Sequence, residues 1–175
     1  MRVFTGLCIG RRLALLVTLS VTLFFFLALP SSERRARAAD RVILAVFVAK
    51  DSGLQNLTMN ELRRIFMNAD DSAFSGQRSV PFNHPAHSTD RIGFDQTVLR
   101  MNPDEVSRFW IDRKIRGLPG PPRAVDSLSQ LLRLVARSSG GIGYARPAQV
   151  SRDVRVIRVD GKLPSEGGYP VQFSD

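Results

Sequence analysis

Residues 80–94 (VPFNHPAHSTDRIGF) combine polar groups that could bind an anion. After a short apolar run and a polar turn, Ser88 and Thr89 begin a predicted helix that continues with Asp90 and Arg91. The start of a helix carries N–H groups without intrahelical partners and a partial positive charge, so it can hold an anion without a cofactor. Hydroxyls and a guanidinium add further donors. Ser88 is equally well explained as an ordinary N-cap, and both interpretations stay open.

Two histidines lie beside this segment, and they raise the question of metal binding or catalysis. His84 and His87 are three positions apart, a spacing that can place two imidazoles on one metal, but Pro85 separates them and no third ligand is evident. No nucleophile-elbow pattern surrounds Ser88, which argues against a hydrolase. We therefore predict no enzymatic activity, no metal and no cofactor. A protonated His87 could still reach an anion held near Ser88.

Residues 1–38 have the organisation of an export signal. Basic residues precede an apolar run over 13–29, and the small residues Ala36 and Ala38 suit a signal peptidase. The apolar run is long for a signal core and at the short limit for a membrane span, so an uncleaved anchor, the one expected membrane contact, remains the alternative. Either route places the rest of the chain outside the cytoplasm, in the periplasm or cell envelope.

Charge and cysteine content argue against some functions for the exported part. Of the formal net charge of +9, residues 1–38 contribute six Arg and one Glu, so +4 remains on residues 39–175. No basic run with interleaved aromatic residues is present, which argues against a nucleic-acid partner. The single cysteine, Cys8, precedes the apolar run, so the exported part has no disulfide and no cysteine metal ligand. The remaining length suffices for one domain.

Hydrophobic periodicity and helix-capping signals predict alternating strands and helices. The clearest signals are the capping box Thr58–Glu61 and the Asn102-Pro103 helix start. Strands are predicted over 41–49, 79–82, 142–145 and 154–159, helices from 59, 89, 103 and 128, and loops over 68–76 and 117–122. This alternation predicts an α/β domain over residues 39–160, followed by an irregular tail over 161–175.

Three segments resemble the phosphate-type periplasmic substrate-binding proteins in order and spacing. Residues 56–66 resemble the family's helix with a Leu-Thr/Ser start and a Leu-x-x-Ile-Phe run. Residues 88–94 lie where the family has a Ser-rich, Arg-containing helix start followed by a buried Phe, and Gly141–Tyr144 resembles its Gly-Ala-Ile-Gly-Tyr segment. The resemblance covers about Val42 to Val159.

The resemblance implies a periplasmic-binding-protein-like (type 2) three-layer α/β fold, present as a single lobe or a truncated version. It also implies capture of inorganic phosphate or a related oxyanion for an ABC importer, with the permease as a partner. Ser88 would hydrogen-bond the anion, Thr89 and the N–H groups of Asp90 and Arg91 would line the site, and Arg91 would supply charge. Asp90 departs from this pattern, since its carboxylate could occupy the positive helix end or accept the proton of hydrogen phosphate.

A second departure supports another function. Full-length members enclose their ligand between two lobes, and the Gly/Ser-rich loop of the first lobe is not visible in this sequence. A ligand held from one side stays hydrated, and charge-assisted bonds weaken in high dielectric. The alternative hypothesis is therefore an envelope interaction or regulatory protein that keeps the fold but has little or no ligand affinity.

Overall fold

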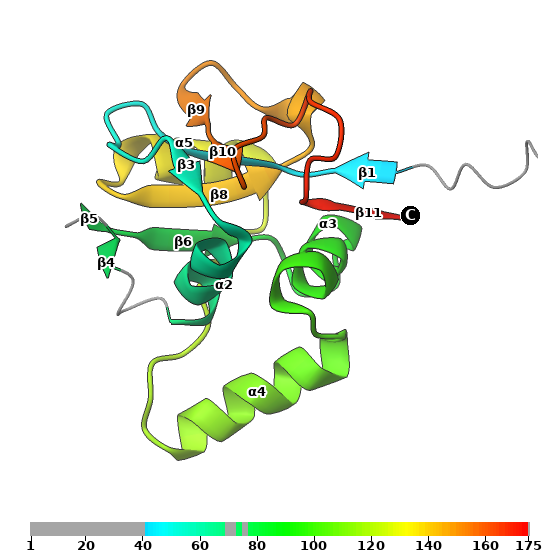
Figure 1. Cartoon of the computed structure of the whole chain (residues 1–175). Helices are drawn as coiled ribbons and strands as arrows, with labels where there is room; N and C mark the ends of the chain where they lie inside the picture. Colours follow the sequence, from blue (N-terminus) through cyan, green and yellow to red (C-terminus); the bar gives the residue numbers. More distant parts are fainter. Residues whose placement is uncertain (1–40, 69–72, 75–76, 175) are drawn as a thin grey trace, which may run out of the picture. The chain divides into compact units, whose positions relative to one another are not determined.

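The fold is built on a five-stranded mixed sheet (Figure 1). The computed structural model describes residues 41–68, 73–74 and 77–174, so the predicted export signal, with Cys8, lies outside the described residues. The strands follow the order β7-β6-β8-β2-β9, with β6 parallel to β7 and β8, and β2 antiparallel to β8 and β9. Their bounds are β2 Ala45–Ala49, β6 Val80–Asn83, β7 Arg123–Ala124, β8 Gly141–Ala145 and β9 Val154–Val156.

The helices begin where the capping signals predict. The capping boxes of Thr58 with Glu61 and of Asn102 with Glu105 are both formed. The helices are α2 Met59–Met67, α3 Thr89–Phe94 with its π-helical continuation η2 Asp95–Leu99, α4 Pro103–Ile115 and α5 Leu128–Arg137, and η3 is a 3₁₀ turn over Pro147–Gln149. Among the described residues, none of the helices combines the length and apolar character needed to cross a membrane.

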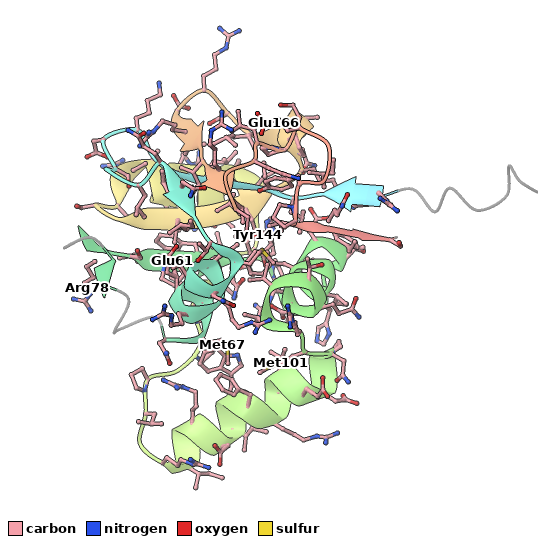
Figure 2. The ribbon with its side chains drawn as sticks, viewed as in Figure 1. Glu61, Met67, Arg78, Met101, Tyr144 and Glu166 are labelled. Carbon is pink, nitrogen blue, oxygen red and sulfur yellow. The ribbon has the colours of Figure 1, made fainter. Side chains whose placement is uncertain are left out.

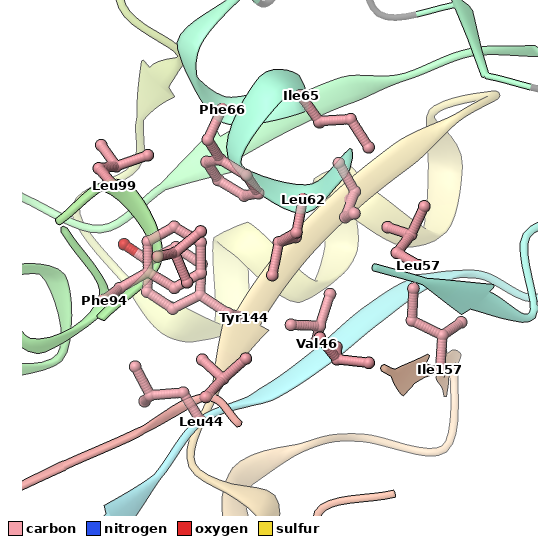
Figure 3. Packing of buried hydrophobic residues seen from close by; sticks show 14 of the residues in the cluster. Leu44, Val46, Leu57, Leu62, Ile65, Phe66, Phe94, Leu99, Tyr144 and Ile157 are labelled. Atoms are coloured by element: carbon pink, nitrogen blue, oxygen red, sulfur yellow. The ribbon is translucent and has the colours of Figure 1, made fainter. Parts of the chain in front are cut away.

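Alternating side chains of β2 divide the core into two clusters. Val46 and Val48 face the cluster that contains α2 and α3, whereas Phe47 faces the cluster that contains α5. This follows from the two-residue period of a strand, and because both faces are covered, β2 is buried throughout. The domain therefore has three layers, with the larger core cluster on the α2 and α3 side (Figure 3).

An aromatic group joins α2, α3 and β8 in this larger cluster. The ring of Tyr144 stacks on that of Phe94, with centroids 3.7 Å apart and an interplanar angle of 3°. The Phe66 ring of α2 lies 4.7 Å from that of Phe94 and 5.8 Å from that of Tyr144. These three side chains meet in Figure 3. Tyr144 is fully buried.

Two glycines are required by close approach of other elements. A Cβ at Gly143 would lie 2.9 Å from a methyl group of Leu131. The absence of a side chain at Gly143 therefore lets α5 pack closely on β8. Gly93 lowers the helix propensity of α3 by about 1 kcal/mol relative to Ala. The reason for its presence is tertiary, because a Cβ there would lie 2.3 Å from the Phe173 ring.

The strand predictions are correct in place but wrong in continuity. The run 41–49 divides into β1 Arg41–Ile43 and β2, and the run 154–159 into β9 and β10 Arg158–Val159. β10 pairs in parallel with β3 Asn56–Leu57, outside the central sheet. Continuous apolar character marks burial, but it does not show which strand a residue will pair with.

The loop over 68–76 and the tail over 161–175 contain structure that the sequence did not predict. β4 Ala73–Phe74 pairs with β5 Gln77–Arg78, and β11 Gln172–Ser174 pairs antiparallel with β1. The tail also buries Tyr169 and Val171. Strands of two or three residues are too short to show a period, so only their partners reveal them.

The two tyrosines of the chain should stay protonated at the pH where an exposed tyrosine ionises. Burial raises the pKa of Tyr169 to about 12 and that of Tyr144 well above its usual value. The neutral phenols therefore stabilise the fold fully below about pH 10, and this contribution is lost as pH rises further. We expect no tyrosinate absorbance near 295 nm at pH 10 in the native protein, whereas the urea-unfolded chain should titrate normally. A native transition near pH 10 would contradict this burial.

Candidate functional site

Ser88 begins α3 as its N-cap. β6 ends at Asn83, and a turn carries the chain to Ser88, whose backbone is extended at φ −75° and ψ 142°. The N–H of Arg91 donates to Ser88 Oγ at 3.4 Å. Ser88 Oγ in turn donates to the carbonyl of Pro85 at 2.8 Å. The N-cap interpretation is confirmed, and the hydroxyl proton of Ser88 is directed into the preceding turn.

The first residues of α3 leave backbone donors open. Thr89 is exposed and Asp90 is half-buried, and within the described part of the chain neither N–H has a hydrogen-bond acceptor. Asp90 Oδ1 accepts from Nε of Arg146 at 2.9 Å. Arg146 follows β8 directly, so this ion pair ties the start of α3 to the end of the neighbouring strand.

Arg91 points into the protein. Its Nε lies 2.6 Å from Asp95 Oδ2, and both side chains are less than one-tenth exposed. The second contact of the guanidinium is a 3.4 Å hydrogen bond to the carbonyl of His84. Burial raises the pKa of the Asp95 carboxyl, and the Arg91 charge partly offsets that rise. Arg91 is therefore the counter-ion of Asp95 and braces the turn before α3.

Hydrogen bonds between β6 and β8 hold this turn in place. The hydroxyl of Tyr144 donates to Asn83 Oδ1 at 2.9 Å, and His84 Nε2 lies 2.8 Å from the carbonyl oxygen of Tyr144. His84 is buried in these contacts, whereas His87 is exposed. The part of the chain that the structure describes holds no group of three or more His, Cys, Asp or Glu side chains placed for a metal ion.

The four residues singled out by the sequence thus lie together at the start of α3 but differ in accessibility. Ser88, Thr89 and Asp90 reach the surface, and Arg91 does not. Asp95 and Arg146 also belong to this region, although the sequence did not point to them. The i to i+4 spacing of Arg91 and Asp95 is a local signal for an ion pair. Arg146 has no such signal, because it reaches Asp90 only through the pairing of distant strands.

A surface hollow of about 380 Å³ lies elsewhere, toward the beginning of β6. Its lining consists of Arg78, Val80, Pro81 and residues 120–123. The lining does not include residues 88–91, so this hollow and the start of α3 are separate features.

Solved structures resemble this fold at low sequence identity. An ABC-type phosphate transport receptor from Vibrio cholerae matches with a TM-score of 0.59 and 18% identity over 75% of this chain and 54% of its own. A candidate phosphate ABC transporter substrate-binding protein with bound phosphate, from Clostridium perfringens, matches with a TM-score of 0.60 and 18% identity. This match covers 77% of this chain and 54% of the other. PstS from Borrelia burgdorferi matches with a TM-score of 0.56 and 11% identity, over 77% of this chain and 55% of its own.

These likenesses establish the fold as that of periplasmic substrate-binding proteins, in a chain that spans about half the length of the solved structures it matches. The expected single-lobe or truncated α/β fold is confirmed. No protein-family model matches the sequence, and a comparison with curated proteins also gives no match.

The buried ion pair of Arg91 with Asp95 predicts that Arg91 stabilises the fold. Unfolding measurements without ligand test this role separately from ligand binding. Asp95→Asn leaves the guanidinium without a counter-charge and should lower the free energy of unfolding by about 3 kcal/mol. The double variant Arg91→Met with Asp95→Leu removes both charges and should lose less than about 1 kcal/mol. Urea denaturation measures both values. Equal losses in the two variants would show that the pair is not coupled.

Proposed function

We propose that this chain is an exported solute-binding module for phosphate or a related oxyanion, held at the start of α3. The observation that carries the proposal is the pair of open N–H donors on Thr89 and Asp90, at an accessible helix start in this fold. Helix starts bind anions through such donors and through the helix dipole. The fold supports the proposal because solved proteins that share it include phosphate transport receptors.

The charge at this site comes from a different residue than expected. Arg91 is committed to Asp95, so its expected role of supplying charge passes to Arg146, the guanidinium that contacts Asp90. The side chain of Arg146 is 40% exposed, which allows it to contact a ligand and Asp90 together. Ser88 would hold the turn and orient the donors, while Thr89 would add its hydroxyl.

The proposed setting of this function rests on the predicted export signal and on the fold. The module would act in the periplasm or cell envelope and deliver its ligand to an ABC permease. If the apolar run over 13–29 is kept as an anchor, the module would work at the membrane surface. We propose no cofactor and no enzymatic step.

One observation favours the second function, an envelope interaction or regulatory module with little ligand affinity. The polar side chains expected to grip an anion already have partners inside the domain: Ser88 donates to Pro85, Asp90 pairs with Arg146, and Arg91 pairs with Asp95. Binding would therefore rest on backbone donors in a site open to water, where each bond contributes less.

A proline at the first helical position separates the two functions. Thr89→Pro deletes one proposed donor, yet proline is favoured at this position, and the extended backbone of Ser88 suits a residue before proline. We expect about tenfold weaker phosphate binding by calorimetry, since hydrogen bonds to charged groups are worth roughly 1.5–3 kcal/mol. Thr89→Ala keeps the N–H and loses only the hydroxyl, so the difference in affinity between the two variants reports the N–H. If millimolar phosphate produces neither heat nor a melting shift in the unaltered protein, the oxyanion-binding proposal fails and the interaction or regulatory function is favoured.

Substitution of Asp90 tests which oxyanion the proposed site prefers. Its carboxylate can accept the proton that hydrogen phosphate carries at neutral pH and sulfate lacks. In the Asp90→Asn variant we therefore expect phosphate affinity to fall while sulfate affinity holds or rises. Parallel titrations with phosphate, sulfate and molybdate measure this selectivity. Phosphate binding that holds or improves in the variant would show that Asp90 is no proton acceptor.

A further inference from the structure

Helix α4 presents apolar side chains to solvent. In the described part of the chain, the exposed large apolar residues are Ile111, Ile115 and Leu118, all on α4 or directly after it. Ile111 is 59% and Ile115 80% exposed, and Val106 is the one buried residue among the 13 residues of α4. A contiguous exposed apolar stripe on a soluble domain marks an interaction surface.

This stripe lies opposite the side by which α4 attaches to the domain. The attached side packs toward Met67 and Met101, which lie between α4 and the helices above it in Figure 2. Arg113 fastens the same side by donating to Asn68 Oδ1 at 3.1 Å. At 100° per residue, Ile111 and Ile115 fall on the far side of the helix. Figure 1 shows the sheet and the other helices on one side of α4 only.

Beside the stripe runs a row of charges that alternates in sign. Its members, spaced four residues apart, are Asp104, Arg108, Asp112 and Arg116. Rows with this spacing form the ridges by which helices pack together. In an antiparallel copy centred at the level of residue 110, Asp104 lies opposite Arg116, and Arg108 lies opposite Asp112. The row is therefore complementary to itself.

We propose that α4 pairs antiparallel with α4 of a second copy of this chain. The two Ile111 side chains lie one residue, about 1.5 Å along the helix, from the two-fold axis and meet there, with the charge rows facing one another. A helix of 13 residues spans about 20 Å, so the interface is small and the dimer is reversible. None of residues 88–91 takes part, so the pairing is independent of the oxyanion site.

Neither ion pairing within one helix nor attraction to a membrane accounts for both the apolar stripe and the charge row. Ion pairs at i to i+4, such as Arg116 with Asp112 at 3.0 Å, stabilise a single helix, but they do not require exposed Ile111 and Ile115. An anionic lipid surface recruits clusters of positive charge. The row carries two positive and two negative charges, which a second copy matches and a membrane does not.

Charge exchange tests the pairing in the full chain. Two forms with different affinity tags are co-expressed, captured through one tag and quantified through the other. When two Arg108→Asp copies pair, the new carboxylate of each faces Asp112 of the other copy. When two Asp112→Arg copies pair, the new guanidinium of each faces Arg108 of the other copy. Each variant alone should co-capture about tenfold less than the unaltered chain, since like charges face each other twice. Co-expressing the two variants restores opposite charge at every position of the row, and co-capture should return.

Control variants keep the test interpretable. Arg133→Asp makes the same charge change at an exposed position of α5 and should leave co-capture unchanged. Ile111→Ser should weaken co-capture without changing the melting temperature, because this side chain is largely exposed. The proposal is overturned if the unaltered chain is not co-captured, or if the mixed variants associate no better than each variant alone. Phosphate titration of the same variants reports on the oxyanion site separately.

Discussion

The contacts of Tyr144 determine where the candidate site lies relative to the sheet. Its ring stacks on Phe94 of α3, its hydroxyl bonds to Asn83 at the end of β6, and its carbonyl oxygen contacts His84. One residue therefore joins β8, β6 and α3 in a fully buried position. An unpaired hydroxyl there would cost free energy, so its hydrogen bond to Asn83 selects one position for the chain leaving β6. The turn to Ser88, and hence the direction of the first N–H groups of α3, follows from that position.

Charge around α3 is largely balanced within the domain. Arg91 neutralises Asp95 inside the protein, and Arg146 neutralises Asp90 near the surface. A buried ion pair contributes little net stability compared with apolar residues, but removing one partner is costly. The inner pair is therefore structural. The outer pair is partly exposed, so its contribution to stability is small.

A shared fold does not establish a shared activity, because function depends on the site that a fold carries. Here the chain spans about half the length of the solved structures it matches, so the fold by itself does not carry their activity over to this chain. The exposed face of α4 is a feature that nothing inside the domain accounts for. Its charge row is complementary to itself, which is the basis of the proposed pairing of two copies. The pairing and the oxyanion site do not require each other, since they involve different helices.

Local sequence patterns were enough to predict the helix starts, the main strands and the fold. The capping boxes at Thr58 and Asn102 predicted helix starts correctly, because cap and N3 residues interact within one turn. Apolar runs marked β2 and β8, and the ordered motifs pointed to the correct fold. Only the tertiary structure decided that Gly93 receives the Phe173 ring, that β11 pairs with β1, and that Arg146 reaches Asp90. It also turned Arg91 inward, although its sequence neighbours suggested a ligand-binding cation. Each of these outcomes depends on partners far apart in the chain, whose proximity no local spacing encodes.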